Sequence, residues 1–258
     1  MSTLAGVLGF PVGHSRSPAM MNAAFAELGL DWRYLKLPVS PERFEQAVRA
    51  LPGSGYRGAN VTLPHKLAAH DLVDDLSDAA RAIGAVNTLS FHDDGRVAGH
   101  NTDASGLLDA LGEPVPATAL VLGAGGAARA AAWALAQAGA EVSVWNRTPE
   151  RAEQLTADLG VAYAERPGPA ELLVNATSIG LERGDSLDGL PLVDAQVVVD
   201  LVYGDAPTPF VRWGEERGAR VVGGLEVLVR QGARSLTLWT GEEPPLDAMR
   251  RAAFQAAV

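Results

Sequence analysis

The chain has 258 residues, with 31 acidic and 21 basic side chains, a formal net charge of −10 and no cysteine. An acidic balance with no basic run excludes a general binder of nucleic acid or of anionic membranes, although a locally positive site for a small anion is compatible with it. The absence of cysteine excludes disulfides and thiolate metal sites, and no run of about 18 apolar residues is present. We expect a cytoplasmic protein of two modest domains.

The first pattern is an apolar strand over residues 3–8 that leads into a polar loop, GFPVGHSRSP. Ser17 before Pro18 is typical of a helix N-cap followed by a first-turn proline, and a helix is predicted to follow over residues 19–28. Capping does not explain Ser15. Two hydroxyls beside a helix N-terminus could together hydrogen-bond a small anion.

Strands and helices alternate after this loop, which predicts an α/β layer. The predicted elements are a strand at 32–37, a helix at 40–51, strands at 58–62 and 84–89, a helix at 77–83, a hairpin return at 96–99 and a helix at 104–111.

Polar residues stand at or just past the ends of these strands: Asn60, Lys66, Asn87 and Asp103. Lys66 is one of only two lysines; it is either a solvated surface residue or a functional cation. Asp103 either stabilises the N-terminus of the next helix or belongs to a site. Because open α/β sheets bind ligands beyond the carboxyl ends of their strands, these residues are candidates for a ligand site.

Residues 119–138, ALVLGAGGAARAAAWALAQA, read as a strand, a tight turn and a helix. Gly123, Gly125 and Ala128 fill a G-x-G-x-x-G/A frame, whose small residues allow the sharp turn and let backbone amides approach a pyrophosphate. The helix N-terminus would face the phosphates. The alternative is a tight strand-to-helix turn without a ligand.

The next predicted strand, residues 140–145, ends in Asn146-Arg147-Thr148. An NAD-binding unit usually has an acidic residue here that binds the ribose hydroxyls. This chain has none, and Arg147 with Arg151 offers planar cations suited to a 2′-phosphate, which favours NADP. Alternatively, Thr148 caps a helix and both arginines are only solvated.

Three more strands are predicted at 171–176, 196–202 and 219–222, with helices at 208–217, 225–239 and from 247 on. Their small or polar ends could line the nicotinamide half of a dinucleotide. Gln231 is unusual within its helix and is a candidate ligand residue.

These residues together make the chain resemble the shikimate dehydrogenase family from end to end. The matching stretches are GFPVGHSRSPAMMN at 9–22, GANVTLPHK at 58–66, GAVNT at 84–88, GHNTDASG at 99–106, GAGGAAR at 123–129, NRTPERA at 146–152, NATSIG at 175–180, DLVYGDAPTPF at 200–210 and GGLEVLVRQGA at 223–233. Two departures are Met21, where the family commonly has His, and Leu181, where it commonly has Met.

The resemblance implies an α/β fold of two domains: an N-terminal α/β substrate domain, residues 1–102 with 232–258, and a Rossmann-type doubly wound nucleotide-binding domain, residues 103–231. It implies a catalytic pair, Lys66 and Asp103. The implied substrate-binding residues are Ser15, Ser17, Asn60, Thr62, Asn87, Tyr203 and Gln231. The implied cofactor-binding residues are Gly123, Ala124, Gly125, Gly126, Ala127, Asn146, Arg147, Thr148, Arg151, Thr177 and Gly224.

The implied activity is the reversible reduction of 3-dehydroshikimate to shikimate with NADPH, in aromatic amino-acid biosynthesis. Hydride transfer to a ketone leaves alkoxide charge, so a cation that also donates a proton serves twice, and Lys66 fits both tasks. We expect a small-molecule substrate, no metal, no nucleic-acid or membrane partner, and a monomer or homodimer. The alternatives are a quinate/shikimate dehydrogenase with broader substrate or NAD use, and a non-catalytic nucleotide-sensing module.

Overall fold

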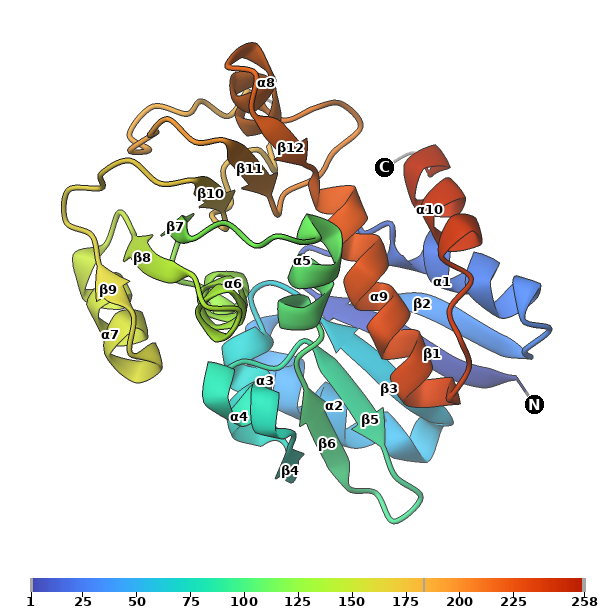
Figure 1. The fold of residues 1–258 in the computed structure, drawn as a ribbon. Coiled ribbons are helices and arrows are strands. Elements are labelled where there is room, and N and C mark those ends of the chain that lie inside the picture. The colour runs from blue at the N-terminus through green and yellow to red at the C-terminus, as the bar shows by residue number, and fades with distance from the viewer. Residues whose placement is uncertain (1, 183, 257–258) are drawn as a thin grey trace. The chain divides into compact units, whose positions relative to one another are not determined.

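The computed structural model describes residues 2–182 and 184–256 (Figure 1). The chain divides into two compact units. The terminal unit comprises Met1–Thr102 and Leu228–Val258, and the middle unit comprises Asp103–Val227.

The terminal unit is built on a mixed sheet of order β2-β1-β3-β5-β6-β4. Its strands are β1 (Thr3–Gly9), β2 (Trp32–Pro38), β3 (Tyr56–Val61), β4 (Asp75–Leu76), β5 (Thr88–Phe91) and β6 (Val97–His100). β1 pairs in parallel with β2 and β3, and β5 is antiparallel to both β3 and β6. The polar residues that follow β1 and β3 therefore leave the same edge of the sheet.

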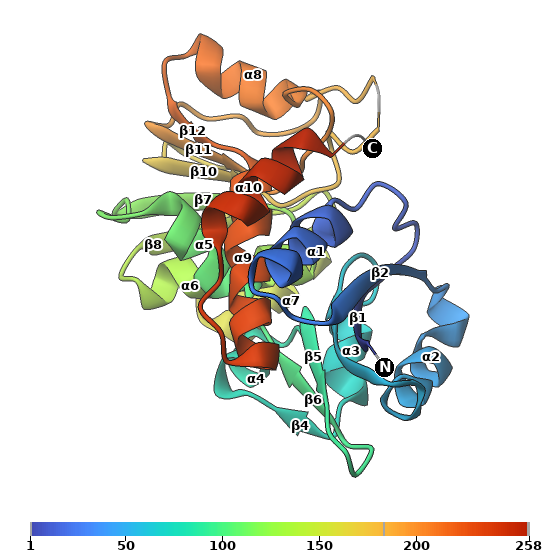
Figure 2. The same ribbon diagram turned by 90° about the vertical axis from the view of Figure 1, so that its right-hand side faces the viewer.

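Helices cover both faces of this sheet: α1 (Ser17–Glu27), α2 (Phe44–Ala50), α3 (Lys66–Leu72), α4 (Asp78–Ile83), α9 (Gly224–Thr240) and α10 (Leu246–Gln255), with 3-10 turns η1 (Pro41–Arg43) and η2 (Pro52–Ser54). Ala5 and Val7 of β1 pack with α1, α9 and α10, whereas Leu8 packs with α2 and α3. In Figure 2, α1 and α2 accordingly lie on opposite sides of β1. Alternation of apolar side chains along a strand buried on both faces produces this sandwich.

The middle unit is a parallel sheet of order β12-β11-β10-β7-β8-β9, with every described pair parallel. Its strands are β7 (Thr118–Leu122), β8 (Glu141–Trp145), β9 (Ala162–Tyr163), β10 (Leu172–Asn175), β11 (Val197–Asp200) and β12 (Arg220–Val222). Its helices are α5 (Asp103–Leu111), α6 (Gly126–Gln137), α7 (Pro149–Leu159) and α8 (Pro209–Glu216). In chain order the strands run 3-2-1-4-5-6, the doubly wound Rossmann order, with its switch point between β7 and β10.

Both faces of the middle sheet are buried. Ala119 and Val121 of β7 pack with the alanines of α6, while Leu120 and Leu122 pack with Phe210 of α8. The fold class predicted from the sequence, a two-domain α/β chain with a Rossmann-type unit, is confirmed.

Local details correct several sequence predictions. Ser17 is not an N-cap: it is the first residue of α1, and Arg16 holds the capping position. Thr148 does occupy the N-cap of α7, but its side chain makes no capping hydrogen bond. The strand predicted over 84–89 begins only at Thr88, because Gly84 ends α4 in a left-handed conformation.

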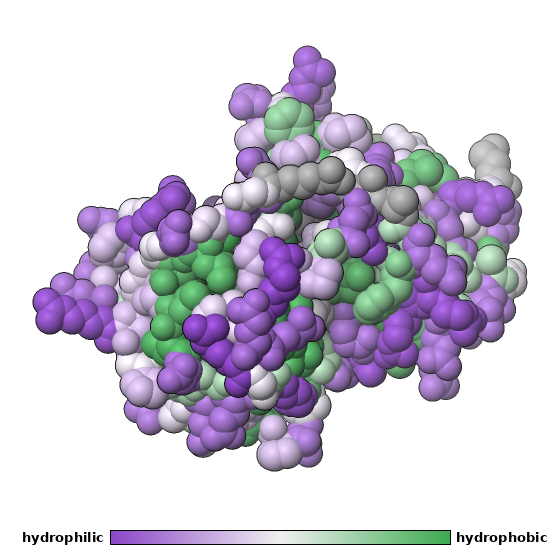
Figure 3. Space-filling model, turned by 90° about the horizontal axis from the view of Figure 1, so that it is seen from above, coloured by the Kyte–Doolittle hydropathy of each residue, from purple (hydrophilic) through white to green (hydrophobic). Residues whose placement is uncertain are grey.

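The departure at Met21 lies in the core of the terminal unit, where the side chain is fully buried. Leu181 is instead 41 % exposed. The face drawn in Figure 3 is mostly hydrophilic, with apolar side chains in separate patches. Among the described residues, none of the helices is long and apolar enough to cross a membrane.

Candidate functional site

A loop with two buried serines follows the carboxyl end of β1. Ser15 and Ser17 are 7 % and 4 % exposed. The Ser15 Oγ accepts a hydrogen bond of 3.3 Å from the Ser17 N–H, which explains why Ser17 enters the helix rather than capping it. Lys36 Nζ donates to the Gly13 carbonyl of the same loop. The loop thus combines hydroxyls, the N-terminus of an 11-residue helix and a nearby cation, a combination suited to a carboxylate.

Beside β5, the Asn87 side chain has its orientation set by the backbone. Its Oδ1 accepts the Thr102 N–H at 2.7 Å, so its Nδ2 must point the other way. That Nδ2 lies 3.0 Å from the Thr102 hydroxyl and 3.3 Å from Gln231 Oε1. Asn87 and Gln231, which are 144 positions apart in the sequence, therefore lie together, as two predicted substrate-binding residues should.

Asn60 lies near the end of β3, and its amide is used within the protein. Its Oδ1 accepts the Tyr34 hydroxyl at 2.6 Å, and its Nδ2 donates to Thr88 and Ser235 at 3.0 and 2.9 Å. The hydroxyls of Thr88, Thr102 and Ser235 lie 3.0 to 3.2 Å from one another. These contacts favour an orienting role for Asn60 behind Asn87.

Sequence reasoning missed Tyr34, Thr88, Thr102 and Ser235 as members of this cluster. Thr88 and Thr102 stood inside matched motifs, GAVNT and GHNTDASG, so a signal for them was present. Tyr34 and Ser235 had none, because only the fold brings β2 and α9 to the same place.

Lys66 is the first residue of α3, and its carbonyl accepts the Val86 N–H at 2.9 Å, which holds it beside the segment that leads to Asn87. The preceding residue, His65, is 1 % exposed and stacks on Phe44 with ring centroids 4.4 Å apart. Burial lowers the pKa of His65, so its ring is neutral at pH 7 and Nε2 donates to the Val39 carbonyl at 2.7 Å. These contacts fix the start of α3.

The other two predicted residues near this edge are Thr62 and Asp103. Thr62 follows β3, and its N–H donates to the Leu8 carbonyl at 2.9 Å. Asp103 is the first residue of α5 and directly follows Thr102, which is bound to Asn87. The backbone therefore connects Asp103 to the Asn87 cluster, while the division between the two units falls just before it.

The glycine turn of the middle unit connects β7 to α6. Gly123 has φ +118°, and a Cβ there would lie 2.7 Å from the Ala176 carbonyl oxygen, so only glycine fits. Gly125 is exposed, and a Cβ there would meet no described atom within 4 Å. Ala128 is fully buried. The turn thus leaves open space in front of the N-terminus of α6, which has 12 residues, and this geometry fits a dinucleotide pyrophosphate.

The residues of this turn that were predicted to bind cofactor differ in exposure: Ala124 and Ala127 are half-buried, and Gly126 is buried as the first residue of α6. At the end of β8, Asn146 Nδ2 donates to the Thr148 carbonyl at 2.9 Å. Arg147 and Arg151 are exposed beside it, at the N-terminus of α7. Arg129 instead pairs with Asp158 at 2.8 Å.

The remaining predicted residues of the middle unit follow β10, β11 and β12. Thr177 donates its hydroxyl to Asn175 Oδ1 at 2.7 Å, and Tyr203 is half-buried in the loop after β11. A Cβ on Gly224 would lie 2.5 Å from the Val202 carbonyl oxygen, so close packing alone requires glycine there. The Rossmann strand order, the glycine turn and these loops define the middle unit as a dinucleotide-binding unit.

Comparison with known proteins identifies the family. Three family models match: the shikimate dehydrogenase substrate-binding domain over residues 7–89, shikimate/quinate 5-dehydrogenase over 109–170 and the shikimate 5′-dehydrogenase C-terminal domain over 224–254. NADP(+)-dependent shikimate dehydrogenases from Anaeromyxobacter dehalogenans (strain 2CP-1) and Methanothermobacter thermautotrophicus are 47 % and 43 % identical, over 97 % and 96 % of this chain and 95 % of each relative. The chain belongs to the shikimate dehydrogenase family.

The structure is also similar to a solved one. The crystal structure of shikimate 5-dehydrogenase from Thermus thermophilus, in complex with NADP(H) and shikimate, matches with a TM-score of 0.88 at 43 % identity, covering 97 % of this chain and 98 % of that one. This likeness extends over both units.

Proposed function

We propose that the chain is an NADP-dependent oxidoreductase that reversibly reduces 3-dehydroshikimate to shikimate. The observation that carries the proposal is the likeness, over nearly the whole chain, to a solved relative that holds both NADP(H) and shikimate. Two features of the described residues support it: hydroxyls and amides that suit a hydroxylated acid, and a glycine turn that suits a dinucleotide. We further propose that it works in the cytoplasm as a monomer or homodimer. The absence of cysteine is compatible with that reducing compartment.

For the substrate, we propose that Ser15 and Ser17 hold the carboxylate, helped by Tyr203. Asn87, Thr62 and Gln231 bind the ring hydroxyls. Asn60 would orient these binding residues rather than the substrate, because its own amide is hydrogen-bonded to Tyr34, Thr88 and Ser235. The amide of Asn87 is held in one orientation by the backbone of Thr102, which lowers the cost of ordering it on binding.

For the cofactor, the backbone around Gly123, Gly125 and Gly126 would hold the pyrophosphate at the start of α6. Arg147 and Arg151 would bind the 2′-phosphate that distinguishes NADP from NAD, with Asn146 and Thr148 shaping the turn. The rest of the bound cofactor would be lined by Ala124, Ala127, Thr177 and Gly224. When bound, the reduced nicotinamide supplies the hydride.

For the chemistry, Lys66 would carry a proton at Nζ for the oxygen that becomes a hydroxyl, and its positive charge would stabilise the developing alkoxide. Asp103 would hydrogen-bond both the ammonium and a neighbouring substrate hydroxyl, which orients the ammonium toward the reacting oxygen. The fixed start of α3, anchored by the His65 ring, would keep Nζ within reach.

The test is a steady-state assay of purified protein with shikimate and NADP, following the absorbance of reduced nicotinamide. We expect turnover with shikimate and NADP that exceeds turnover with quinate or with NAD. Comparable rates with quinate or NAD would instead identify a broader quinate/shikimate dehydrogenase. Binding of NADP without any turnover would overturn the proposal and favour a nucleotide-sensing protein.

A further inference from the structure

A buried carboxylate that the proposed chemistry does not use ends strand β11. Asp200 is fully buried, and its Oδ1 accepts hydrogen bonds from Asn175 Nδ2 at 2.9 Å and from the Val202 N–H at 3.0 Å. Its Oδ2 accepts the Thr208 hydroxyl. Burial raises the pKa of Asp200 to about 6 despite these three donors. An acid kept in such an unfavourable place calls for a role.

On one side, Asp200 controls the loop after β10 through Asn175. Because a carboxylate only accepts, the Asn175 side chain must turn its Nδ2 toward Asp200. Its Oδ1 then accepts both the N–H and the hydroxyl of Thr177, at 3.1 and 2.7 Å. The same Nδ2 donates to the Ile179 carbonyl at 3.1 Å. The position of Thr177 therefore depends on Asp200 through one intervening amide.

On the other side, Asp200 holds both ends of the loop after β11. The Val202 N–H bond fixes the residue before Tyr203. Thr208, which donates to Asp200, also caps α8 by accepting the Val211 N–H at 3.1 Å. At the same place, a Cβ on Gly224 would lie 3.0 Å from the Asp200 carbonyl oxygen, so the start of α9 packs against this strand end.

We propose that Asp200 is a positioning residue for the nicotinamide side of the site. Its carboxylate connects the loops that carry Thr177 and Tyr203, and its backbone carbonyl packs against the start of α9. These segments follow β10, β11 and β12, on the opposite side of the switch point from β8 and its arginines. The inference rests on the proposed function, since it assigns these segments to the nicotinamide and substrate rather than to the adenosine end.

The test compares a whole dinucleotide with a fragment of it. Adenosine 2′,5′-bisphosphate contains the groups that Arg147 and Arg151 would bind but lacks the nicotinamide. For Asp200→Asn, we expect NADP affinity to fall about tenfold and the shikimate KM to rise to a similar extent, because one of the two acceptor oxygens becomes an NH2 donor that cannot accept from the surrounding donors. The affinity for adenosine 2′,5′-bisphosphate, measured by calorimetry, should stay within about twofold.

Equal losses for NADP and the fragment, or no loss for either, would overturn the inference. Asp194→Asn, an exposed position just before β11, makes the same charge change and should alter neither affinity. If Asp200→Asn does not fold, two variants of Thr208 are compared instead. Thr208→Val should reproduce the NADP-selective loss of affinity, whereas Thr208→Ser, which keeps the hydroxyl, should not. Failure of the wild type to turn over shikimate would contradict the proposed function instead, whatever the fragment shows.

Discussion

The candidate sites of the two units differ in whether side chains or backbone form them. In the terminal unit, the site consists of buried side chains: Asn60 and Asn87 join a cluster of hydroxyls that have almost no exposure. In the middle unit, the proposed pyrophosphate position is built from backbone at Gly123–Gly126, with exposed arginines beside it. A substrate site made of side chains should be sensitive to single substitutions, whereas a backbone-built cofactor site should be changed mainly through its charges.

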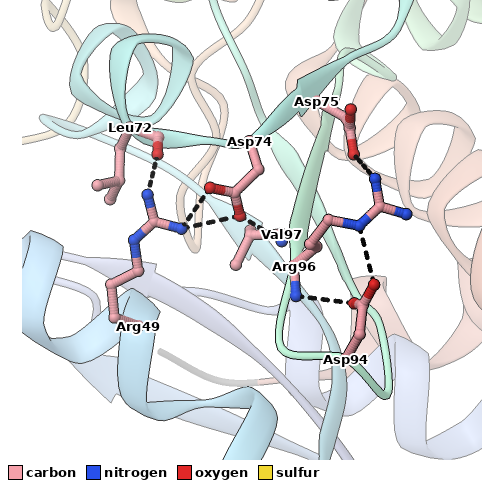
Figure 4. Close-up of polar contacts among 7 residues, drawn as sticks. All are labelled: Arg49, Leu72, Asp74, Asp75, Asp94, Arg96 and Val97. Atoms are coloured by element: carbon pink, nitrogen blue, oxygen red, sulfur yellow. Dashed lines mark hydrogen bonds and ion pairs between the residues drawn. The ribbon is translucent and has the colours of Figure 1, made fainter.

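Two carboxylates show the opposite contrast in burial between the units. Asp74 of the terminal unit lies near the surface, where the Val97 N–H and Arg49 bind it at 2.8 and 2.9 Å and, together with the nearby Arg96, lower its pKa (Figure 4). Asp200 of the middle unit also accepts three hydrogen bonds, yet its pKa rises to about 6 because burial outweighs them. Hydrogen bonds alone do not determine the charge of an acid; access to water and to cations does.

The largest expected effect is on catalysis in the terminal unit. Lys66→Met should lower kcat for shikimate oxidation by about 10²–10⁴-fold, because it removes the proton carrier and the charge opposite the alkoxide. Shikimate affinity, measured by calorimetry, should change by less than about tenfold. Lys36→Met makes the same substitution at the other lysine of the chain: it should keep kcat, although it removes the cation beside the serine loop and should therefore raise the shikimate KM. Near-normal turnover by Lys66→Met would move the proton donor to Asp103, Tyr203 or a water molecule.

Next in size is cofactor selection in the middle unit. Arg147→Ala should weaken NADP binding by about 1.5–3 kcal/mol, the scale of a hydrogen bond to a charged group, and leave NAD nearly unchanged. The change is measured by the KM values of the wild type and the variant for NADP and for NAD. Arg166→Ala, an exposed arginine of the same unit, should affect neither. Equal losses for NADP and NAD would show that Arg147 supports the fold rather than a phosphate.

A smaller effect is expected at the serine loop. Ser15→Ala and Ser17→Ala should each raise the shikimate KM about tenfold while kcat changes little, because the carboxylate is held alike before and during the reaction. Ser15→Ala should have the larger effect on stability, since its Oγ accepts the Ser17 N–H. A fall in kcat with unchanged KM would place these hydroxyls at the reacting carbon instead of the carboxylate.

The last expected effect is on the pH dependence of stability rather than on binding or catalysis, and the two carboxylates should act in opposite directions. The pKa of Asp200 is raised from 3.8 to about 6. Its contribution to the free energy of unfolding, on the order of 2–3 kcal/mol, is therefore fully present below pH 3.8 and is lost as the pH rises through 6. Asp74 has a lowered pKa, so its contribution is present above pH 3.8 and is lost as the pH falls through its folded value.

Urea unfolding between pH 2 and 8 separates these contributions. Asp200→Asn should remove the decrease in unfolding free energy toward pH 7 relative to wild type, and Asp74→Asn should leave that decrease intact while flattening the acid limb. If both variants kept the wild-type profile, the assigned environments of the two carboxylates would be wrong.

Much of this protein could be predicted from its sequence, for physical reasons that differ between the units. The Rossmann frame was readable because a glycine at positive φ and a buried alanine at Ala128 leave a local pattern. The hydroxyl cluster was not, because Asn60 and Ser235 are 175 positions apart and meet only through packing. Helix α3 was missed because its seven residues are too few to show a period. Ser17 was misread because the local pattern does not reveal that Ser15 accepts its N–H.

The most direct test of the central claim follows the hydride itself. Purified protein is incubated with 3-dehydroshikimate and NADPH carrying deuterium at the transferred position, and the product is analysed by mass spectrometry. The account predicts shikimate that has gained a single deuterium, at a rate that falls by orders of magnitude in Lys66→Met. Unlabelled shikimate, or no shikimate at all from the folded protein, would contradict it.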